Sequence, residues 1–137
     1  MDTSTAGKPA ASINATRTIL VVEDMPSVRS YYKFILEKEG FRCEEACDGQ
    51  EALDKIRACT IDLVVLDLVI PKVTGEAVLQ SIRSTAAHAM LPVLVISTEP
   101  AEAKFRRAAT ATTGPVGYAQ KPLMPRIILE EVQHLLA

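Results

Sequence analysis

From residue 18 to the C-terminus, short apolar runs alternate with segments that carry a single apolar stripe. The apolar runs are rich in Val, Ile and Leu, and they predict strands at residues 18–23, 41–46, 62–67, 92–97 and 116–119. The first, third and fourth runs are continuously apolar, whereas strands with one solvated face alternate. We therefore expect a sheet that is covered by helices on both faces.

Between the predicted strands, apolar residues recur at helical spacing. The longest stripe begins at Val28 and ends at Leu36 with i, i+3, i+4, i+7, i+8 spacing, and Gly40 follows it as a typical stop signal. Shorter stripes predict four further helices, near residues 52–56, 78–82, 101–113 and 129–136. The segment 101–113 is rich in Ala and Thr, and Phe105 is its main apolar anchor.

The order of these elements predicts an α/β fold. Strands that alternate with helices through short links form parallel sheets with right-handed crossovers. Five strands and five helices give a doubly wound, five-stranded parallel sheet, and we expect the flavodoxin-like strand order 2-1-3-4-5. Residues 1–17 show no apolar period and predict a flexible N-terminal tail. The domain then covers residues 18–137.

Charge and hydropathy exclude several classes of partner. The chain has 137 residues and a formal net charge of −2, which gives no electrostatic reason to bind nucleic acid or an anionic membrane directly. No stretch approaches the ~20 apolar residues of a membrane span. The N-terminus lacks the basic start and apolar segment of a secretory signal. We expect a cytoplasmic protein.

Acidic residues follow two of the apolar strands. Glu23 ends the first predicted strand and Asp24 follows it, and Asp67 ends the third. Because the carboxyl ends of parallel strands share one edge of the sheet, the three carboxylates should lie together. At ~4 Å and an effective dielectric near 20, each pair would repel by roughly 4 kcal/mol. Hard oxygen ligands that need a cation indicate a Mg²⁺ site.

Two further polar residues belong to the same edge. Ser97 ends the fourth strand, and Lys121 follows the fifth. Lys121 places a cation beside the acidic cluster, and the following Pro122 restricts the backbone turn that orients the lysine.

At these positions the sequence resembles the receiver domain of two-component response regulators, over roughly residues 18–137. The matching motifs are Val21-Val22-Glu23-Asp24, Leu66-Asp67-Leu68-Val69-Ile70-Pro71 with Gly75, Pro92-Val93-Leu94-Val95-Ile96-Ser97, and Tyr118-Ala119-Gln120-Lys121-Pro122. Each motif alone is weak, but all four in this order are highly specific.

The resemblance implies a phosphoryl-transfer site. Asp67 would be the phosphoacceptor, a carboxylate nucleophile that forms an aspartyl phosphate. Mg²⁺ would be held by Glu23, Asp24, Asp67 and the backbone carbonyl of Val69. Glu23 stands where the family more commonly has Asp.

The resemblance also implies a switch. Lys121 would pair with a phosphoryl oxygen, and Ser97, in place of the commoner Thr, would donate its hydroxyl to another. Tyr118 would be the switch aromatic residue, whose ring turns inward and changes the surface that partner proteins bind. Val69 and Glu99 would border the path of the water that removes the phosphate, and an apolar Val69 predicts slow to moderate dephosphorylation.

The function that this implies is a signalling switch rather than an enzyme, apart from autophosphorylation from phosphodonors and autodephosphorylation. A histidine kinase or phosphotransfer protein would supply the phosphoryl group, and an unknown downstream protein would read it. Because the chain ends at Ala137, directly after the last helix, we expect a stand-alone receiver of the chemotaxis-regulator kind. The alternative is a receiver cut from a larger hybrid or output-domain protein.

Two other functions fit the fold but not the residues. A phosphatase with an aspartate nucleophile typically needs a second Asp two residues later as its general acid, and that position is Val69. A flavin-binding electron carrier would need a Ser/Thr/Gly-rich phosphate loop after the first strand, where Met25-Pro26-Ser27 stands.

Overall fold

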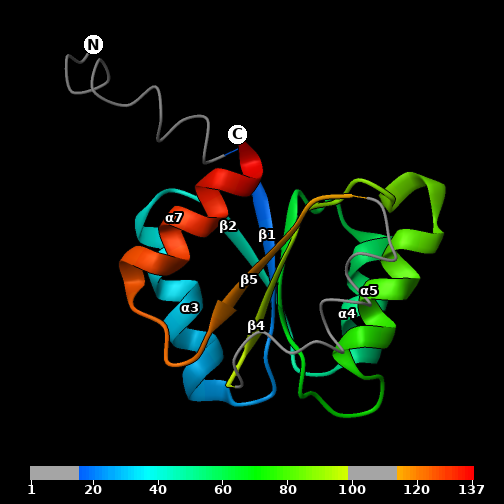
Figure 1. Ribbon diagram of the computed structural model, residues 1–137, viewed down its shortest axis with the longest axis horizontal. Coiled ribbons are helices and arrows are strands. Elements are labelled where there is room, and N and C mark those ends of the chain that lie inside the picture. Colours follow the sequence, from blue (N-terminus) through cyan, green and yellow to red (C-terminus); the bar gives the residue numbers. More distant parts are fainter. Residues whose placement is uncertain (1–15, 99–113) are drawn as a thin grey trace.

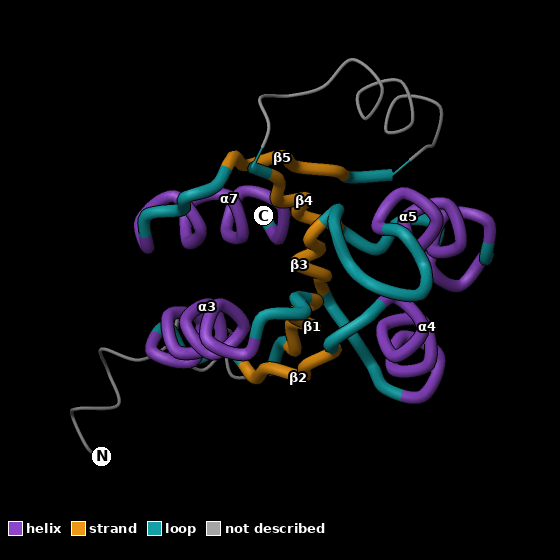
Figure 2. Tube along the Cα trace, turned by 90° about the horizontal axis from the view of Figure 1, so that it is seen from below, coloured by secondary structure: helices purple, strands orange, loops and turns teal. Residues whose placement is uncertain are grey.

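Parallel strands form a single sheet in the computed structural model, which describes residues 16–98 and 114–137. Within these ranges the strands are β1 (Thr18–Val22), β2 (Arg42–Ala46), β3 (Leu63–Asp67), β4 (Val93–Ser97) and β5 (Val116–Gln120). Their order across the sheet is β2-β1-β3-β4-β5 (Figure 2). Every neighbouring pair of strands is parallel. The predicted doubly wound α/β fold and its 2-1-3-4-5 strand order are confirmed.

Helices cover both faces of the sheet. Helices α3 (Pro26–Lys38) and α7 (Pro125–Leu136) lie on one face, and α4 (Gly49–Ala58) and α5 (Gly75–Ser84) lie on the other (Figures 1 and 2). A short 3₁₀ helix, η1 (Ala86–His88), leads from α5 toward β4. The helix predicted at residues 101–113 and most of the predicted tail at residues 1–17 lie outside the described residues.

The central strands separate two apolar cores. All residues of β3 and β4 are buried, which explains why their sequences show no alternation. Successive residues of each strand still point to opposite faces. In β1, Ile19 and Val21 pack under α3 and α7, while Leu20 and Val22 pack under α4 and α5. Burying each such side chain stabilises the fold by about 1.5–3 kcal/mol.

Local signals in the sequence set where the helices begin. The Asp48 side chain accepts a hydrogen bond from the Glu51 amide at 2.8 Å and caps α4, and Thr74 caps α5 by accepting from the Ala77 amide at 3.1 Å. Helices α3 and α7 have a proline in the first turn, where its missing N–H leaves no partner unsatisfied. Helices α3, α4 and α7 start three to five residues after the strand that precedes each of them, and α5 starts eight residues after β3.

The start of α5 packs directly against the backbone that follows β3. The Gly75 amide donates to the Leu68 carbonyl at 3.2 Å. A Cβ atom at Gly75 would lie 2.6 Å from the Leu68 Cα and 2.9 Å from the Asp67 carbonyl oxygen, so only glycine fits. This contact fixes the loop that carries Asp67 and Val69.

At the opposite edge of the sheet, an arginine holds the start of β5. Arg83, in the last turn of α5, donates to the carbonyl oxygens of Leu91 at 2.6 Å and Pro115 at 2.7 Å. The neighbouring Gly114 has a φ of +110°, and a Cβ atom there would collide with the guanidinium group. Helix α5, the approach to β4 and the start of β5 are thereby tied to one side chain.

Candidate functional site

The polar strand ends predicted from the sequence meet at one edge of the sheet. Glu23 and Asp24 directly follow β1, Asp67 ends β3, and Lys121 follows β5. In the described part of the chain, Glu23, Asp24 and Asp67 form a cluster whose ligand oxygens lie within 4.8 Å of one another. Glu23 and Asp67 are buried, whereas Asp24 is exposed. Asp24 is therefore the member of the cluster that faces solvent.

Lys121 joins two of the three carboxylates. Its Nζ lies 3.0 Å from Glu23 Oε1 and 2.8 Å from Asp67 Oδ2. The amide of Lys121 donates to the Ser97 carbonyl at 2.7 Å, which anchors the lysine to the end of β4. The peptide bond between Lys121 and Pro122 is cis. The ammonium group neutralises charge that burial would otherwise make costly.

Backbone amides hold the other carboxylate oxygens. Asp67 Oδ1 accepts a hydrogen bond from the Val69 amide at 3.0 Å, and Glu23 Oε2 accepts one from the Met25 amide at 3.3 Å. Each buried carboxylate thus has one oxygen on the lysine and the other on the loop that follows its own strand. The two side chains are therefore held in position by groups of the protein itself.

Burial and charge shift the pKa values of this cluster in opposite directions. Burial, with the neighbouring Asp67 carboxylate, raises the pKa of Glu23 to about 7, although the ion pair with Lys121 opposes the shift. Burial by itself would lower the pKa of Lys121, but the hydrogen bonds with Asp67 and Glu23 outweigh it and raise that pKa. Lys121 is therefore charged at any physiological pH.

The chemistry of the donor set fits a small divalent cation. Carboxylate oxygens are the ligands that Mg²⁺ prefers, and one or two of them with water suffice. Burial and the neighbouring Asp67 carboxylate raise the pKa of Glu23 against the opposing effect of Lys121, so a single ammonium group compensates the negative charge at this edge only in part. A divalent ion at this edge would supply the missing positive charge, so the residues present fit Mg²⁺.

The two predicted switch residues lie on β4 and β5. Ser97 is the buried last residue of β4, and it is paired in register with Gln120. Tyr118 is half-buried in β5 and packs against the apolar cluster under α4 and α5. The Val69 side chain is 75 % exposed beside Asp67. Glu99, predicted to act with Val69, lies outside the described residues.

Comparison with known proteins assigns this arrangement to a family. The sequence model of the response regulator receiver domain family matches residues 19–133 of this chain. The chain belongs to the response regulator receiver family. The sequence resemblance is thereby confirmed, and receiver domains are signalling modules of two-component systems rather than classical enzymes.

Individual relatives agree with this family. The receiver is 32 % identical, over 120 residues, to the alkaline phosphatase synthesis transcriptional regulatory protein PhoP of Bacillus subtilis. That alignment covers 88 % of this chain and 48 % of PhoP, so the chain spans about half the length of this curated relative.

Two solved structures show the same fold. The chemotaxis protein CheY4 of Vibrio cholerae has a TM-score of 0.80 at 27 % identity, and the match covers 88 % of this chain and 98 % of CheY4. The response regulator TrrA of Thermotoga maritima, solved in complex with Mg²⁺-BeF, has a TM-score of 0.73 at 30 % identity, and the match covers 88 % of this chain and 99 % of TrrA.

Of the receiver's helices at residues 16–98 and 114–137, none has the length and apolar character of a membrane span.

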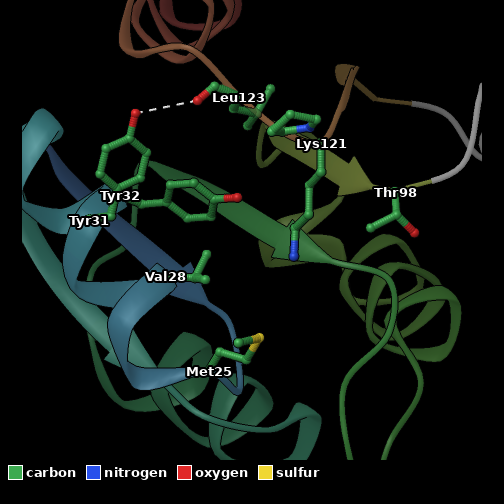
Figure 3. A pocket seen from close by; sticks show the side chains of 8 residues that line it. Met25, Val28, Tyr31, Tyr32, Thr98, Lys121 and Leu123 are labelled. Atoms are coloured by element: carbon green, nitrogen blue, oxygen red, sulfur yellow. Dashed lines mark hydrogen bonds between the residues drawn. The ribbon is translucent and has the colours of Figure 1, made fainter.

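A cavity of about 590 Å³ adjoins the lysine of the receiver. Met25, Val28, Tyr31 and Tyr32 line it from α3 and the turn before it, and Thr98, Pro122 and Leu123 line it from the other side. Lys121 extends between these two walls, and the Tyr32 hydroxyl points into the space (Figure 3). The Tyr31 hydroxyl donates to the Leu123 carbonyl at 3.3 Å. Both tyrosines belong to the apolar stripe that the sequence predicts between Val28 and Leu36.

One residue near the acidic cluster has no counterpart among the sequence predictions. Arg29, in the first turns of α3, donates from Nη1 to the Glu23 carbonyl at 2.7 Å and from Nε to Glu45 Oε1 at 3.0 Å. The only signal in the sequence is a basic residue five positions after Asp24, which is equally typical of a solvated helix face.

The raised pKa of Glu23 predicts how the stability of the metal-free receiver depends on pH. The folded protein keeps a proton on Glu23 up to about pH 7, whereas the unfolded chain releases it near pH 4.5. Unfolding therefore releases a proton in this window, and the free energy of unfolding should fall by about 2–3 kcal/mol from pH 5 to pH 7.5. Urea denaturation at several pH values measures this.

Glu23→Gln is the matched control for this prediction because it keeps the size of the side chain and removes its titration. As pH rises, the unfolding free energy of the wild type should fall and that of Glu23→Gln should not, so the variant should become more stable relative to the wild type. Parallel profiles for the two proteins would show that Glu23 does not titrate in this window.

Proposed function

We propose that this receiver is a phosphorylation-dependent signalling switch that accepts a phosphoryl group on Asp67 from a histidine kinase or a phosphotransfer protein in the presence of Mg²⁺. The observation that carries the proposal is the buried Asp67 carboxylate, held between the ammonium of Lys121 and the Val69 amide, with Glu23 and Asp24 within ligand distance of one ion. A carboxylate fixed in this way is a nucleophile whose counter-charges are already in place.

In the transfer step an Asp67 carboxylate oxygen attacks phosphorus. A new O–P bond forms as the bond between phosphorus and the donor's imidazole nitrogen breaks, and the electron pair of that bond leaves with the imidazole. The Val69 amide holds Oδ1, and Lys121 lies at Oδ2, where it can follow the negative charge onto a phosphoryl oxygen. Positioning and electrostatics supply most of the catalysis in such transfers.

Glu23, Asp24, Asp67 and the backbone carbonyl of Val69 are the proposed ligands of Mg²⁺. When bound, the ion would neutralise charge on the phosphoryl oxygens. The donor set fits it, and TrrA, 30 % identical to this receiver, has been solved with Mg²⁺-BeF.

The signal is proposed to leave the site through β4 and β5. The Ser97 hydroxyl would donate to a phosphoryl oxygen, and Tyr118, two residues beyond the start of β5, would respond by changing its packing. This is a small packing change that biases a two-state element. It fits the half-buried position of Tyr118 in β5.

We propose output through contact with another protein. The net charge of −2 does not favour direct binding of nucleic acid, even though the relative PhoP is a transcriptional regulator. Residues 18–137 would form the switch, and a cytoplasmic location would give it access to a kinase.

The test of this function uses a small phosphodonor. Wild-type protein incubated with acetyl phosphate and Mg²⁺ should gain one phosphoryl group per chain by intact mass, and should lose the labelling when the metal is chelated. It should not turn over phosphate esters such as p-nitrophenyl phosphate. Failure of the folded wild type to label under these conditions would contradict the proposal.

The exposed Val69 side chain predicts the lifetime of the phosphate. An apolar group offers no hydrogen bond to an attacking water, so Val69→Asn, which can hold such a water, should shorten the half-life of the phosphorylated protein. One added hydrogen bond of about 1 kcal/mol corresponds to roughly fivefold. The decay of the phosphorylated mass after the donor is removed measures it, with Val69→Leu as a control that changes the side chain but keeps it apolar. An unchanged half-life for Val69→Asn would remove this role for the side chain.

A further inference from the structure

Glu23 and Asp24 follow β1 at the point where the neighbouring strand β2 ends. The Glu23 amide donates to the Ala46 carbonyl at 3.0 Å, and β2 ends at that residue. If the parallel ladder continued, the Glu23 carbonyl would accept a hydrogen bond from the amide two residues after Ala46, but that residue, Asp48, lies beyond β2 as the N-cap of α4. Because the amide and carbonyl of a strand residue point to the same side, the Glu23 carbonyl faces the place where β2 has ended.

A side chain fills this place. Arg29 Nη1 donates to the Glu23 carbonyl at 2.7 Å, a short bond from a charged donor. The arginine side chain is only 17 % exposed, and the Arg29 amide donates to the Met25 carbonyl at 2.9 Å within the first turn of α3. The helix that follows β1 thus returns a donor to the end of the same strand.

The guanidinium group is itself held from β2. Its Nε donates to Glu45 Oε1 at 3.0 Å, and Lys33, one turn further along α3, donates to the second oxygen of the same carboxylate at 3.0 Å. These ion pairs lower the pKa of Glu45, so its charge persists at neutral pH. The planar guanidinium group presents two donors in fixed geometry, so Arg29 can bond the Glu23 carbonyl and the Glu45 carboxylate of β2 at the same time. A lysine ammonium, which is a point charge on a flexible stem, would hold these two acceptors less rigidly.

We propose that Arg29 is a positioning residue for the acidic site. By completing the hydrogen bonding at the end of β1, it fixes the peptide that joins Glu23 to Asp24, and so sets the separation of the two side chains proposed to hold Mg²⁺. It touches neither carboxylate of that pair, because its contact is with the backbone between them. The inference rests on the proposed function for the identity of the cation, but not for the contact itself.

Two measurements on Arg29→Gln test it, with Lys33→Ala as the matched control. The control removes a cation from the same helix and the same Glu45 carboxylate, but it leaves the Glu23 carbonyl bonded. In metal-free protein, the amides of Glu23 and Met25 should exchange hydrogen faster in Arg29→Gln than in wild type, and at the wild-type rate in Lys33→Ala.

Calorimetric titration with Mg²⁺ should then give a dissociation constant about tenfold higher for Arg29→Gln, which is ~1.4 kcal/mol. The constant should stay within about twofold of wild type for Lys33→Ala. The labelling rate of Arg29→Gln from acetyl phosphate should recover at saturating Mg²⁺, which a general loss of folded protein would not allow.

The outcomes separate this inference from the proposed function. Wild-type protein that binds no Mg²⁺ would contradict the proposed function, whereas the amide exchange of the metal-free variants would still decide the role of Arg29. Wild-type exchange in Arg29→Gln, or faster exchange with unchanged Mg²⁺ affinity, would overturn the inference. If Arg29→Gln does not fold, Arg29→Lys is used in its place. Arg29→Lys should bind Mg²⁺ more weakly than the wild type does, and an affinity equal to that of the wild type would overturn the inference.

Discussion

Asp67→Asn should take up no detectable phosphoryl group from acetyl phosphate and Mg²⁺ under conditions that label the wild type fully. The amide is no longer an anionic nucleophile, and loss of a nucleophile lowers rates by about three orders of magnitude or more. The variant should still fold, because Lys121 keeps its 3.0 Å ion pair with Glu23 when the Asp67 charge is removed. Intact-mass measurement of the labelled protein checks the prediction.

Asp62→Asn is the control for this experiment. Asp62 Oδ2 accepts a hydrogen bond from the Thr18 amide at 2.7 Å, at the opposite edge of the sheet from Asp67. The same change of acid to amide there should leave labelling at the wild-type level. If Asp67→Asn were labelled as fully as the wild type, another residue would be the acceptor, and the assignment of Asp67 would be wrong.

Lys121→Ala should lower the free energy of unfolding of the metal-free protein by about 3 kcal/mol at pH 8. The substitution leaves two buried carboxylates, with side-chain exposures of 1 % for Glu23 and 7 % for Asp67, without their shared cation. Removing one partner of a buried ion pair destabilises proteins by about this amount. Urea denaturation measures the difference. The loss should shrink at pH 5, where a proton on Glu23 removes part of the uncompensated charge, and also when Mg²⁺ is added.

Lys33→Ala gives the comparison for an ion pair near the surface. Its partner Glu45 is 36 % exposed, and such a pair contributes about 1 kcal/mol or less. A Lys121→Ala variant no less stable than Lys33→Ala would show that the lysine does not compensate the buried carboxylates. Labelling by acetyl phosphate should also slow in Lys121→Ala, because no ammonium then faces the phosphoryl group.

The fold was predictable because strand and helix periods were unusually clear. The continuous apolar runs place β3 and β4 within one residue of their predicted bounds, since burial on both faces leaves no other reading for Leu63–Asp67 or Val93–Ser97. The meeting of Glu23, Asp24, Asp67 and Lys121 followed from the same topology, because parallel strands bring their carboxyl ends to one edge.

Side-chain partners were harder to predict than positions. The period of a pattern tells which face a residue occupies, but not how far a long side chain reaches. Nothing in the sequence indicated that Lys121 bonds both Glu23 and Asp67, or that Arg29 turns back to a strand carbonyl instead of facing water. The burial of Glu23 was equally hidden, since an acidic residue after a strand more often lies in solvent.

The Arg83 contacts have a consequence for how β5 can move. At its start the strand is held through the Pro115 carbonyl by an arginine that bonds neutral carbonyl oxygens. At its far end it is held through Lys121, by carboxylates whose charge depends on protons, metal and phosphate. Chemistry at the site can loosen only the second attachment. We therefore expect β5 to pivot about Pro115 as a hinge, so that displacements grow along the strand and are larger at Tyr118 than at Val116.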